Sequence, residues 1–137
     1  MRQMPTMTSY MHPFPWAVDV ERSPSEALAE MDKHGIHHLP VKSGNEVIGL
    51  VSALQLQHTL AEHTATTDLS EYCNAETPQF QTRDALDIVL THMIDHNQHA
   101  ALIMKADKLA GIYTSHDAII HLCKLLNELY PQGDDAA

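Results

Sequence analysis

The sequence predicts an α/β protein built from two copies of one unit. Two junctions, at residues 49–55 and 111–117, share one plan: a glycine lies in an apolar strand, a hydroxyl side chain ends it, and a helix follows. Other positions of matching chemistry recur at the same separation along the chain. The equivalent pairs are Gly49 and Gly111, Ser52 and Thr114, Met31 and Met93, His37 and His99, His34 and His96, Leu28 and Leu90, Val41 and Ile103, and Leu60 and Leu122. An internal repeat of this length indicates two supersecondary units.

The composition is typical of one ordered body, since 44% of the 137 residues are hydrophobic and 19% are charged. Eight Lys and Arg residues against 18 Asp and Glu residues give a net charge of -10. Such a charge repels phosphate backbones and anionic membrane surfaces, and the basic residues form no run. We therefore expect neither a nucleic acid nor a membrane as a partner.

The two cysteines, Cys73 and Cys123, lie far apart in a chain that shows no secretory apolar segment. A disulfide framework is therefore not expected. No apolar run reaches the ~20 residues that a membrane span requires. These observations favour a cytoplasmic location.

The first unit is expected at residues 11–62, after an N-terminal arm at residues 1–10 that is either loose or docked. Ser23 and Glu26 form a capping box around Pro24, which predicts a helix start. The predicted elements of this unit are a strand at 18–20, a helix from Pro24 to its C-terminal cap Gly35, strands at 39–41 and 47–51, and a helix at 53–62.

The second unit is expected at residues 71–130, after a polar linker at 63–70, and it repeats this order. Thr82 is predicted to cap its first helix, which carries Leu86 and Met93. Strands are predicted at 100–104 and 109–113, a long apolar helix at 115–129, and a C-terminal tail at 131–137.

These motifs resemble those of a known family, the tandem CBS (cystathionine β-synthase-type) domain pair, or Bateman module. The first unit carries His34-Gly35-Ile36-His37-His38-Leu39-Pro40-Val41 and then Gly49-Leu50-Val51-Ser52. The second unit is similar from Gly111 to Asp117, and Met11-His12-Pro13 resembles the start of the family pattern. The resemblance spans about residues 11–129. It implies two β-α-β-β-α repeats packed as a pseudo-twofold pair with two clefts, and a regulatory protein that is no enzyme and needs no catalytic cofactor.

The resemblance also implies an adenosine-containing ligand: AMP, ADP, ATP or S-adenosylmethionine. Thr114 would meet a phosphate or the ribose, and Asp117 the ribose hydroxyls. The other contacts that it implies are Ile112 and His116 in the same turn, Trp16, Ala17, Val18, Ile36 and His37 from the first unit, and His99. Homodimers are usual in the family, so the helices at 54–60 and 119–129 are expected at a dimer interface, and an unknown regulated protein is the expected partner.

The chemistry of the two junctions favours the cleft of Asp117 over its equivalent. A carboxylate has two acceptor oxygens and can hold both hydroxyls of a cis-diol, whereas the amide of Gln55 has one acceptor oxygen. We expect the cleft of Ser52 and Gln55 to bind a nucleotide poorly.

Three alternatives remain open at this stage. Thr114 and Asp117 are also the residues of a helix capping box, which needs no ligand. On that interpretation the module is a structural one with empty clefts that pairs with another protein through its helices.

His92, His96 and His99 suggest a metal sensor, although no Cys or carboxylate completes a ligand set and we expect no metal. Ser115-His116-Asp117 has the residue types of a catalytic triad, but consecutive side chains at a helix start diverge, so no catalytic residue is expected.

Overall fold

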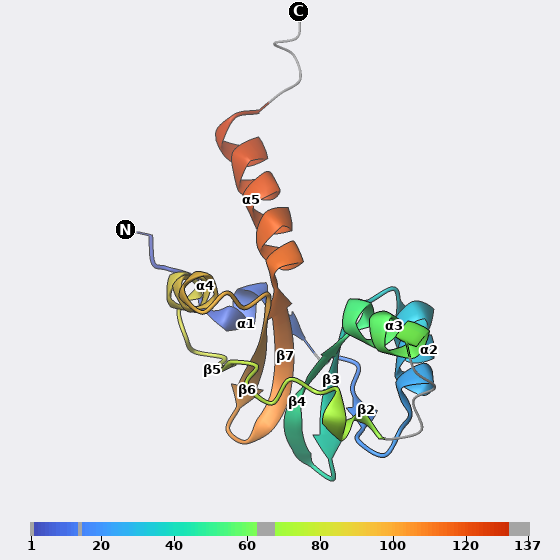
Figure 1. Cartoon of the computed structure of the whole chain (residues 1–137). Helices are drawn as coiled ribbons and strands as arrows, with labels where there is room; N and C mark the ends of the chain where they lie inside the picture. Colours follow the sequence, from blue (N-terminus) through green and yellow to red (C-terminus); the bar gives the residue numbers. More distant parts are fainter. Residues whose placement is uncertain (1, 14, 63–67, 132–137) are drawn as a thin grey trace, which may run out of the picture.

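The computed structural model describes residues 2–13, 15–62 and 68–131, and it contains both predicted units (Figure 1). The first unit consists of β2 (Val18–Asp19), α2 (Pro24–His34), β3 (His38–Ser43), β4 (Glu46–Ser52) and α3 (Ala53–Glu62). The second unit consists of β5 (Gln79–Gln81), α4 (Leu86–Asp95), β6 (Ala100–Lys105), β7 (Lys108–Thr114) and α5 (Ser115–Leu129). Two β-α-β-β-α repeats are thus confirmed. The described residues also form three short elements that the sequence did not predict: α1 (Met7–Tyr10), β1 (His12–Pro13) and a 3-10 turn, η1 (Leu69–Glu71).

Each unit contributes one sheet, and the two sheets have the same internal pairing. In the order β2-β3-β4, the first pair is parallel and the second antiparallel, and β5-β6-β7 repeats this arrangement with β1 added at its edge. Both β3 and β6 carry a register shift, after Val41 and after Ile103, which are equivalent positions of the repeat. The sheets lie between α4 on one side and α2 and α3 on the other (Figure 1).

Three groups of buried residues make up the core. One lies inside the first unit, around Met31 and Leu39, and one inside the second unit, around Met93 and Ile103. A third group joins the two units through apolar side chains of β4, β6 and β7. Its buried members are Val47, Leu50, Ala100, Leu102, Met104 and Ile112. The two units are therefore joined by a common apolar core, and this core holds the strands of one unit next to those of the other.

The predicted caps of α2 are both confirmed. The side chain of Ser23 accepts a hydrogen bond from the amide of Glu26, and the Glu26 carboxylate accepts one from the amide of Ser23. At the other end Gly35 has a φ of 64°, a left-handed conformation that glycine adopts without a steric penalty. The helix ends at His34, so the residues that follow are directed back to the sheet.

The predicted cap of α4 is wrong. The helix begins at Leu86 after Ala85, with no side-chain cap, whereas Thr82 lies further back and its carbonyl accepts hydrogen bonds from the backbone N–H and hydroxyl of Thr8. The amide of Leu86 donates instead to the carbonyl of Pro5. A backbone group of the N-terminal arm thus takes the place of a capping side chain. Of the two alternatives that the sequence left open for the arm, loose or docked, the structure shows the docked one from Pro5 onward.

The arm docks on the second unit, although it precedes the first. Met7 of α1 is fully buried in the second unit's core, and Leu69 of η1 is fully buried in the first unit's core. Met7 and Leu69 are equivalent positions of the repeat, since their separation equals that of Gly49 and Gly111. The core of each unit is therefore completed by a residue from the segment that leads into the other unit. Residues 63–67 of the predicted linker and residues 132–137 of the predicted tail lie outside the described part of the chain.

Two glycines allow these leading segments to approach the sheets. A Cβ atom on Gly111 would lie 2.6 Å from Met11 Sδ and 2.7 Å from the carbonyl oxygen of His12, and one on Gly49 would meet the side chain of Cys73. Such distances are shorter than any normal contact, so β1 can pair with β7 only where residue 111 lacks a side chain. Gly49 and Gly111, which mark the repeat in the sequence, thus leave the space in which each leading segment lies against the sheet of the other unit.

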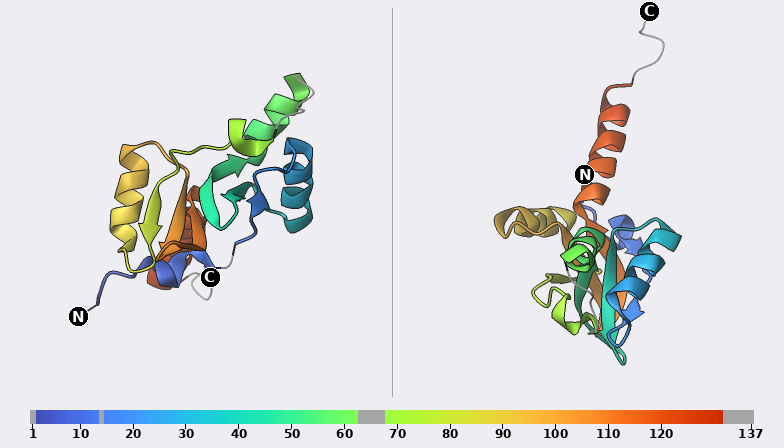
Figure 2. Two further views of the ribbon diagram at one scale, coloured as in Figure 1. Left: turned by 90° about the horizontal axis from the view of Figure 1, so that it is seen from below. Right: turned by 45° about the vertical axis from the view of Figure 1, so that its right-hand side comes forward.

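Helix α5 projects away from the body in two views (Figure 1, Figure 2). Its first turn contacts β7, and every residue from Leu122 to Tyr130 is exposed. Helix α3, its equivalent, packs against α2 through the fully buried Leu56, where α5 has the smaller Ala118. None of the described helices is both long and apolar enough to span a membrane.

Candidate functional site

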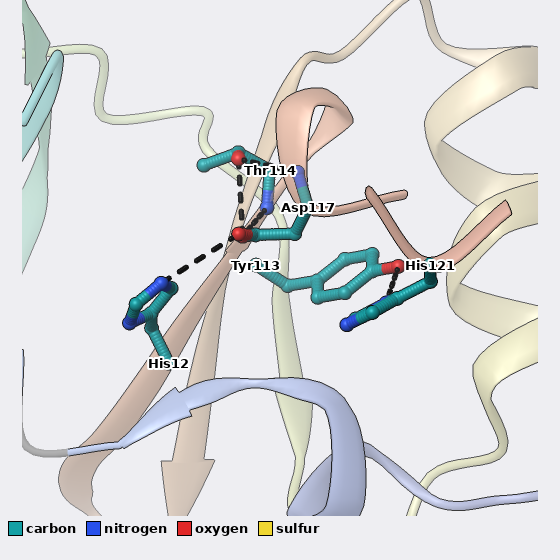
Figure 3. A network of polar contacts seen from close by, with 5 residues as sticks. All are labelled: His12, Tyr113, Thr114, Asp117 and His121. Atoms are coloured by element: carbon teal, nitrogen blue, oxygen red, sulfur yellow. Dashed lines mark hydrogen bonds and ion pairs between the residues drawn. The ribbon is translucent and has the colours of Figure 1, made fainter. Parts of the chain in front are cut away.

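The site is built on the junction between β7 and α5. Thr114 is the N-cap of α5: its hydroxyl accepts a hydrogen bond from the amide of Asp117 at 3.3 Å. In return, the amide and the hydroxyl of Thr114 donate to Asp117 Oδ2 at 2.9 and 3.0 Å (Figure 3). These bonds hold the carboxylate, which is only 8% exposed, in one orientation at the positive end of the helix dipole.

The second carboxylate oxygen of Asp117 faces the N-terminal segment. His12 Nε2 lies 3.8 Å from Asp117 Oδ1, because β1 pairs with β7 in a register that places His12 opposite Ile112 (Figure 3). The capping box therefore uses only one of the two oxygens. The capping box of Thr114 and Asp117 is confirmed, and it leaves Oδ1 without a hydrogen bond from Thr114.

A cavity of about 400 Å³ adjoins this carboxylate, between the two units. It brings together residues that lie far apart in the sequence: the segment after β1, the end of α2 with the start of β3, and the start of α5. Its lining residues are His12, Pro13, Pro15, Trp16, His34, Ile36, His37, His38, Pro40, His99, Ile112, Thr114, Ser115, His116 and Asp117. We call this cavity the Asp117 cleft.

Eight of the ten predicted site residues line the Asp117 cleft: Trp16, Ile36, His37, His99, Ile112, Thr114, His116 and Asp117. The other two do not. Ala17 is exposed outside the lining, and Val18 is 8% exposed within the core of the first unit, where β2 begins.

Seven lining residues were not predicted: His12, Pro13, Pro15, His34, His38, Pro40 and Ser115. His34 and His38 flank the predicted Ile36 and His37 in the sequence, so the His-rich run itself was the available signal. The position of His12 had no such signal, since it depends on the pairing of β1 with β7 across the chain.

The wall opposite α5 is aromatic. Trp16 stacks on His34 with ring centroids 3.7 Å apart and ring planes 6° apart, and the indole is still 57% exposed. Stacking fixes the indole plane at the cleft. A flat apolar ligand can therefore lie against Trp16, while polar groups of the same ligand reach the start of α5.

The electrostatics of the cleft come from imidazoles and one carboxylate. Within the described part of the chain, no Lys or Arg lines the cleft. Burial lowers the pKa of His38, and His37 and His99 lower it further. Behind Asp117, burial raises the pKa of Tyr113 to about 12, and its hydroxyl lies 3.1 Å from Nδ1 of His121 on α5 (Figure 3). Tyr113 is thus neutral at physiological pH and serves as a hydrogen-bonding partner of α5.

The equivalent cleft at Ser52 is smaller, about 330 Å³, and its lining includes Gln55, Asn74 and Thr77. Gln55 donates its backbone N–H to the Ser52 hydroxyl at 3.2 Å, so this junction keeps the cap but has no carboxylate. His38 and His99 line both clefts.

The His residues that suggested a metal site have other partners. His92 and His96 stack with ring centroids 4.0 Å apart, and His99 Nδ1 lies 3.3 Å from the hydroxyl of Ser115. Among the described residues, no three His, Cys, Asp or Glu side chains lie close enough together to hold a metal ion.

Comparison with known proteins agrees with this architecture. Residues 7–62 match the family model of the CBS domain. Among solved structures, an acetoin utilization protein (AcuB) from Vibrio cholerae superposes with a TM-score of 0.81 at 20% identity, covering 96% of this chain and 99% of that one. Residues 7–62 are thus similar to a CBS domain, and the chain as a whole has the fold of a CBS domain pair.

Two structures of similar fold contain adenosine compounds. The CBS domain pair of protein MJ0100, in complex with 5′-methylthioadenosine and S-adenosyl-L-methionine, has a TM-score of 0.81 at 18% identity and covers 90% of this chain and 99% of its own. CBSX2 in complex with AMP has a TM-score of 0.73 at 17% identity and covers 88% and 98%. At these identities the likeness establishes the fold. No curated protein matches the sequence significantly.

Proposed function

We propose that this protein is a cytoplasmic, non-catalytic regulatory module that binds an adenosine-containing ligand in the Asp117 cleft and signals to a partner protein. The observation that carries the proposal is the pairing, within one cavity, of the exposed Trp16 ring with the Asp117 carboxylate. An adenine ring can stack on Trp16, and Asp117 Oδ1 can accept a hydrogen bond from a ribose hydroxyl. The adenosine ligands of MJ0100 and CBSX2, which share the fold, support the proposal.

The position of the cleft supports a signalling role. Trp16 belongs to the first unit and Asp117 to the second, so a ligand that contacts both changes the free energy of packing one unit on the other. Asp117 also lies at the start of α5, the helix that projects from the body. A change at the ligand therefore reaches an exposed surface that a partner can bind.

Trp16 is the chain's single tryptophan, which provides the direct test. Titration with AMP, ADP, ATP or S-adenosylmethionine should change the intensity of its fluorescence and saturate, because a stacked base alters the environment of an indole that is now half exposed. The same ligand should raise the unfolding midpoint by several degrees at about 100 times its dissociation constant. Absence of both effects with all four compounds would overturn the proposal.

We also propose that the protein is a homodimer and that α5 lies at the interface. Ile119, Leu122, Leu126 and Leu129 repeat at the spacing of a helical stripe, and they are between 45% and 60% exposed. A helix of this length is marginal in water unless an apolar face is covered. A second copy would cover this stripe with the same surface, as twofold symmetry requires.

Leu126→Glu should convert the dimer into a monomer, because it places a charge in the middle of the stripe. Sedimentation equilibrium measures the change in mass. Asn127→Glu adds the same charge beside the stripe and should leave the dimer intact. A wild-type monomer would instead favour the second candidate function, an interaction module whose α5 stripe binds a different protein.

A further inference from the structure

The Asp117 cleft is unusual in the groups that can balance a ligand's charge. Six of its fifteen lining residues are histidines: His12, His34, His37, His38, His99 and His116. Among the described residues that line it, Asp117 is the one carboxylate, and none is Lys or Arg. Since the chain as a whole carries a net charge of -10 with neutral histidines, an anionic group entering the cleft meets a repulsive field unless imidazoles are protonated.

Three of the six histidines surround the start of α5. His12 Nε2 is 3.8 Å from Asp117 Oδ1, His99 Nδ1 is 3.3 Å from the Ser115 hydroxyl, and His116 adjoins Asp117 in the first turn. They come from β1, from the residue before β6 and from α5, so they approach the same end of the cleft from three elements. This end already carries the positive pole of the helix.

The other three histidines lie on the first unit's side. His34 stacks on Trp16, and its Nε2 lies 3.8 Å from Glu30, the carboxylate that faces it on α2. His38 is largely buried, and burial together with His37 and His99 lowers its pKa, against a smaller opposing effect of Asp117. His38 therefore stays neutral at neutral pH. The imidazoles that face a group bound at the start of α5 are therefore His12, His99 and His116.

We infer that the Asp117 cleft recognises a phosphate-bearing adenosine ligand through proton uptake by His12, His99 and His116, and that ligand affinity therefore rises as the pH falls. The inference rests on the proposed function and names its ligand class and its regulation. A bound phosphate raises the pKa of an imidazolium beside it. The resulting gain in ligand affinity is therefore fully present below the pKa that the histidine has in the free protein, and it is lost as the pH rises through the raised pKa of the complex.

Calorimetric titration with two probes tests this inference. Adenosine carries no charge, and the methyl ester of AMP is a phosphodiester that keeps one negative charge at about pH 6 and about pH 8, unlike AMP, whose phosphate itself titrates near 6. The phosphodiester should bind several-fold more tightly at the lower pH, since a rise of one unit in one histidine pKa on binding changes the affinity by at most about tenfold. Adenosine should show little change. Titration in buffers of different ionisation enthalpy should show proton uptake with the phosphodiester alone.

A double variant assigns the effect to the named residues. His12→Gln with His116→Gln should remove most of the proton uptake and lower the ratio of phosphodiester affinity to adenosine affinity. His58→Gln is the matched control, because His58 is an exposed histidine of α3 that pairs with Glu62 and lies outside the cleft. This control should bind both probes as the wild type does.

The outcomes separate the inference from the proposed function. If adenosine binds and the phosphodiester shows no proton uptake and no tightening at lower pH, the inference is overturned and the adenosine site stands. Retention of full proton uptake in the double variant also overturns it. Failure of both probes to bind at either pH overturns the inference, whereas the proposed function is overturned only when AMP, ADP, ATP and S-adenosylmethionine also leave the Trp16 fluorescence and the unfolding midpoint unchanged.

Discussion

Replacing Met7 with alanine will lower the free energy of unfolding by about 2–5 kcal/mol, the range observed when a buried methionine or leucine is truncated. Met7 lies on the N-terminal arm, yet it is fully buried beside Val89, Met93 and Tyr113 of the second unit. The cavity left by the substitution therefore opens in the second unit. Urea denaturation followed by circular dichroism measures the loss, and Leu69→Ala in η1 should produce a loss of similar size.

Met4→Ala provides the matched control. Met4 belongs to the same arm but is 52% exposed, so its truncation should change the unfolding free energy by about 0.5 kcal/mol or less. Hydrogen exchange locates the effect: Met7→Ala should speed exchange in β6 and β7 first, and Leu69→Ala in β3 and β4. Faster exchange in β3 and β4 of the Met7 variant would contradict the crossed arrangement of the two leading segments.

The internal repeat made most of this fold predictable from the sequence. Capping boxes, turn glycines and apolar periods are local signals, and they located α2, α3, β3, β4, β6, β7 and α5 within one or two residues. The same repeat identified the junction of Thr114 and Asp117 as the place where a strand end meets a helix start. Local chemistry decides these features, so local sequence reveals them.

The crossing of the leading segments was not predictable in this way. Both α1 and η1 are a single turn long, with no helical period to detect, and Met7 and Leu69 are buried only because a distant part of the chain surrounds them. The absence of a side-chain cap on α4 follows from the same cause, since the carbonyl of Pro5 occupies the position that Thr82 was predicted to serve. Long-range backbone contacts decided both.

The candidate site shows the same division. The family resemblance implied that Ile36 and His37 of the first unit lie near Thr114 of the second unit, and all three residues line one cavity. Ala17 and Val18 do not line it, because Val18 begins β2 and its side chain packs into the first unit's core. His12 reaches Asp117 through the pairing of β1 with β7, which needs the bare backbone of Gly111.

Asp117→Asn should weaken binding of an adenosine ligand by about ten- to a hundredfold, since it replaces a charge-assisted hydrogen bond by a neutral one or by none. Two hydrogen bonds from Thr114 hold Oδ2, so the amide oxygen of asparagine will take that position and its NH₂ group will face His12 and the ligand. A donor will then stand where the ribose hydroxyls need an acceptor. Fluorescence of Trp16 measures the loss.

The fold should tolerate this change better than the ligand does. Asparagine keeps both hydrogen bonds from Thr114 through its amide oxygen but loses the negative charge at the start of α5, a loss of about 0.3–1 kcal/mol. Gln55→Ala is the matched control, because Gln55 occupies the equivalent position of the other junction and donates only its backbone N–H to Ser52. Equal affinity in Asp117→Asn and wild type would reduce Asp117 to a helix cap. Loss of binding in both variants would indicate a ligand that needs both clefts, which His38 and His99 already connect as shared walls.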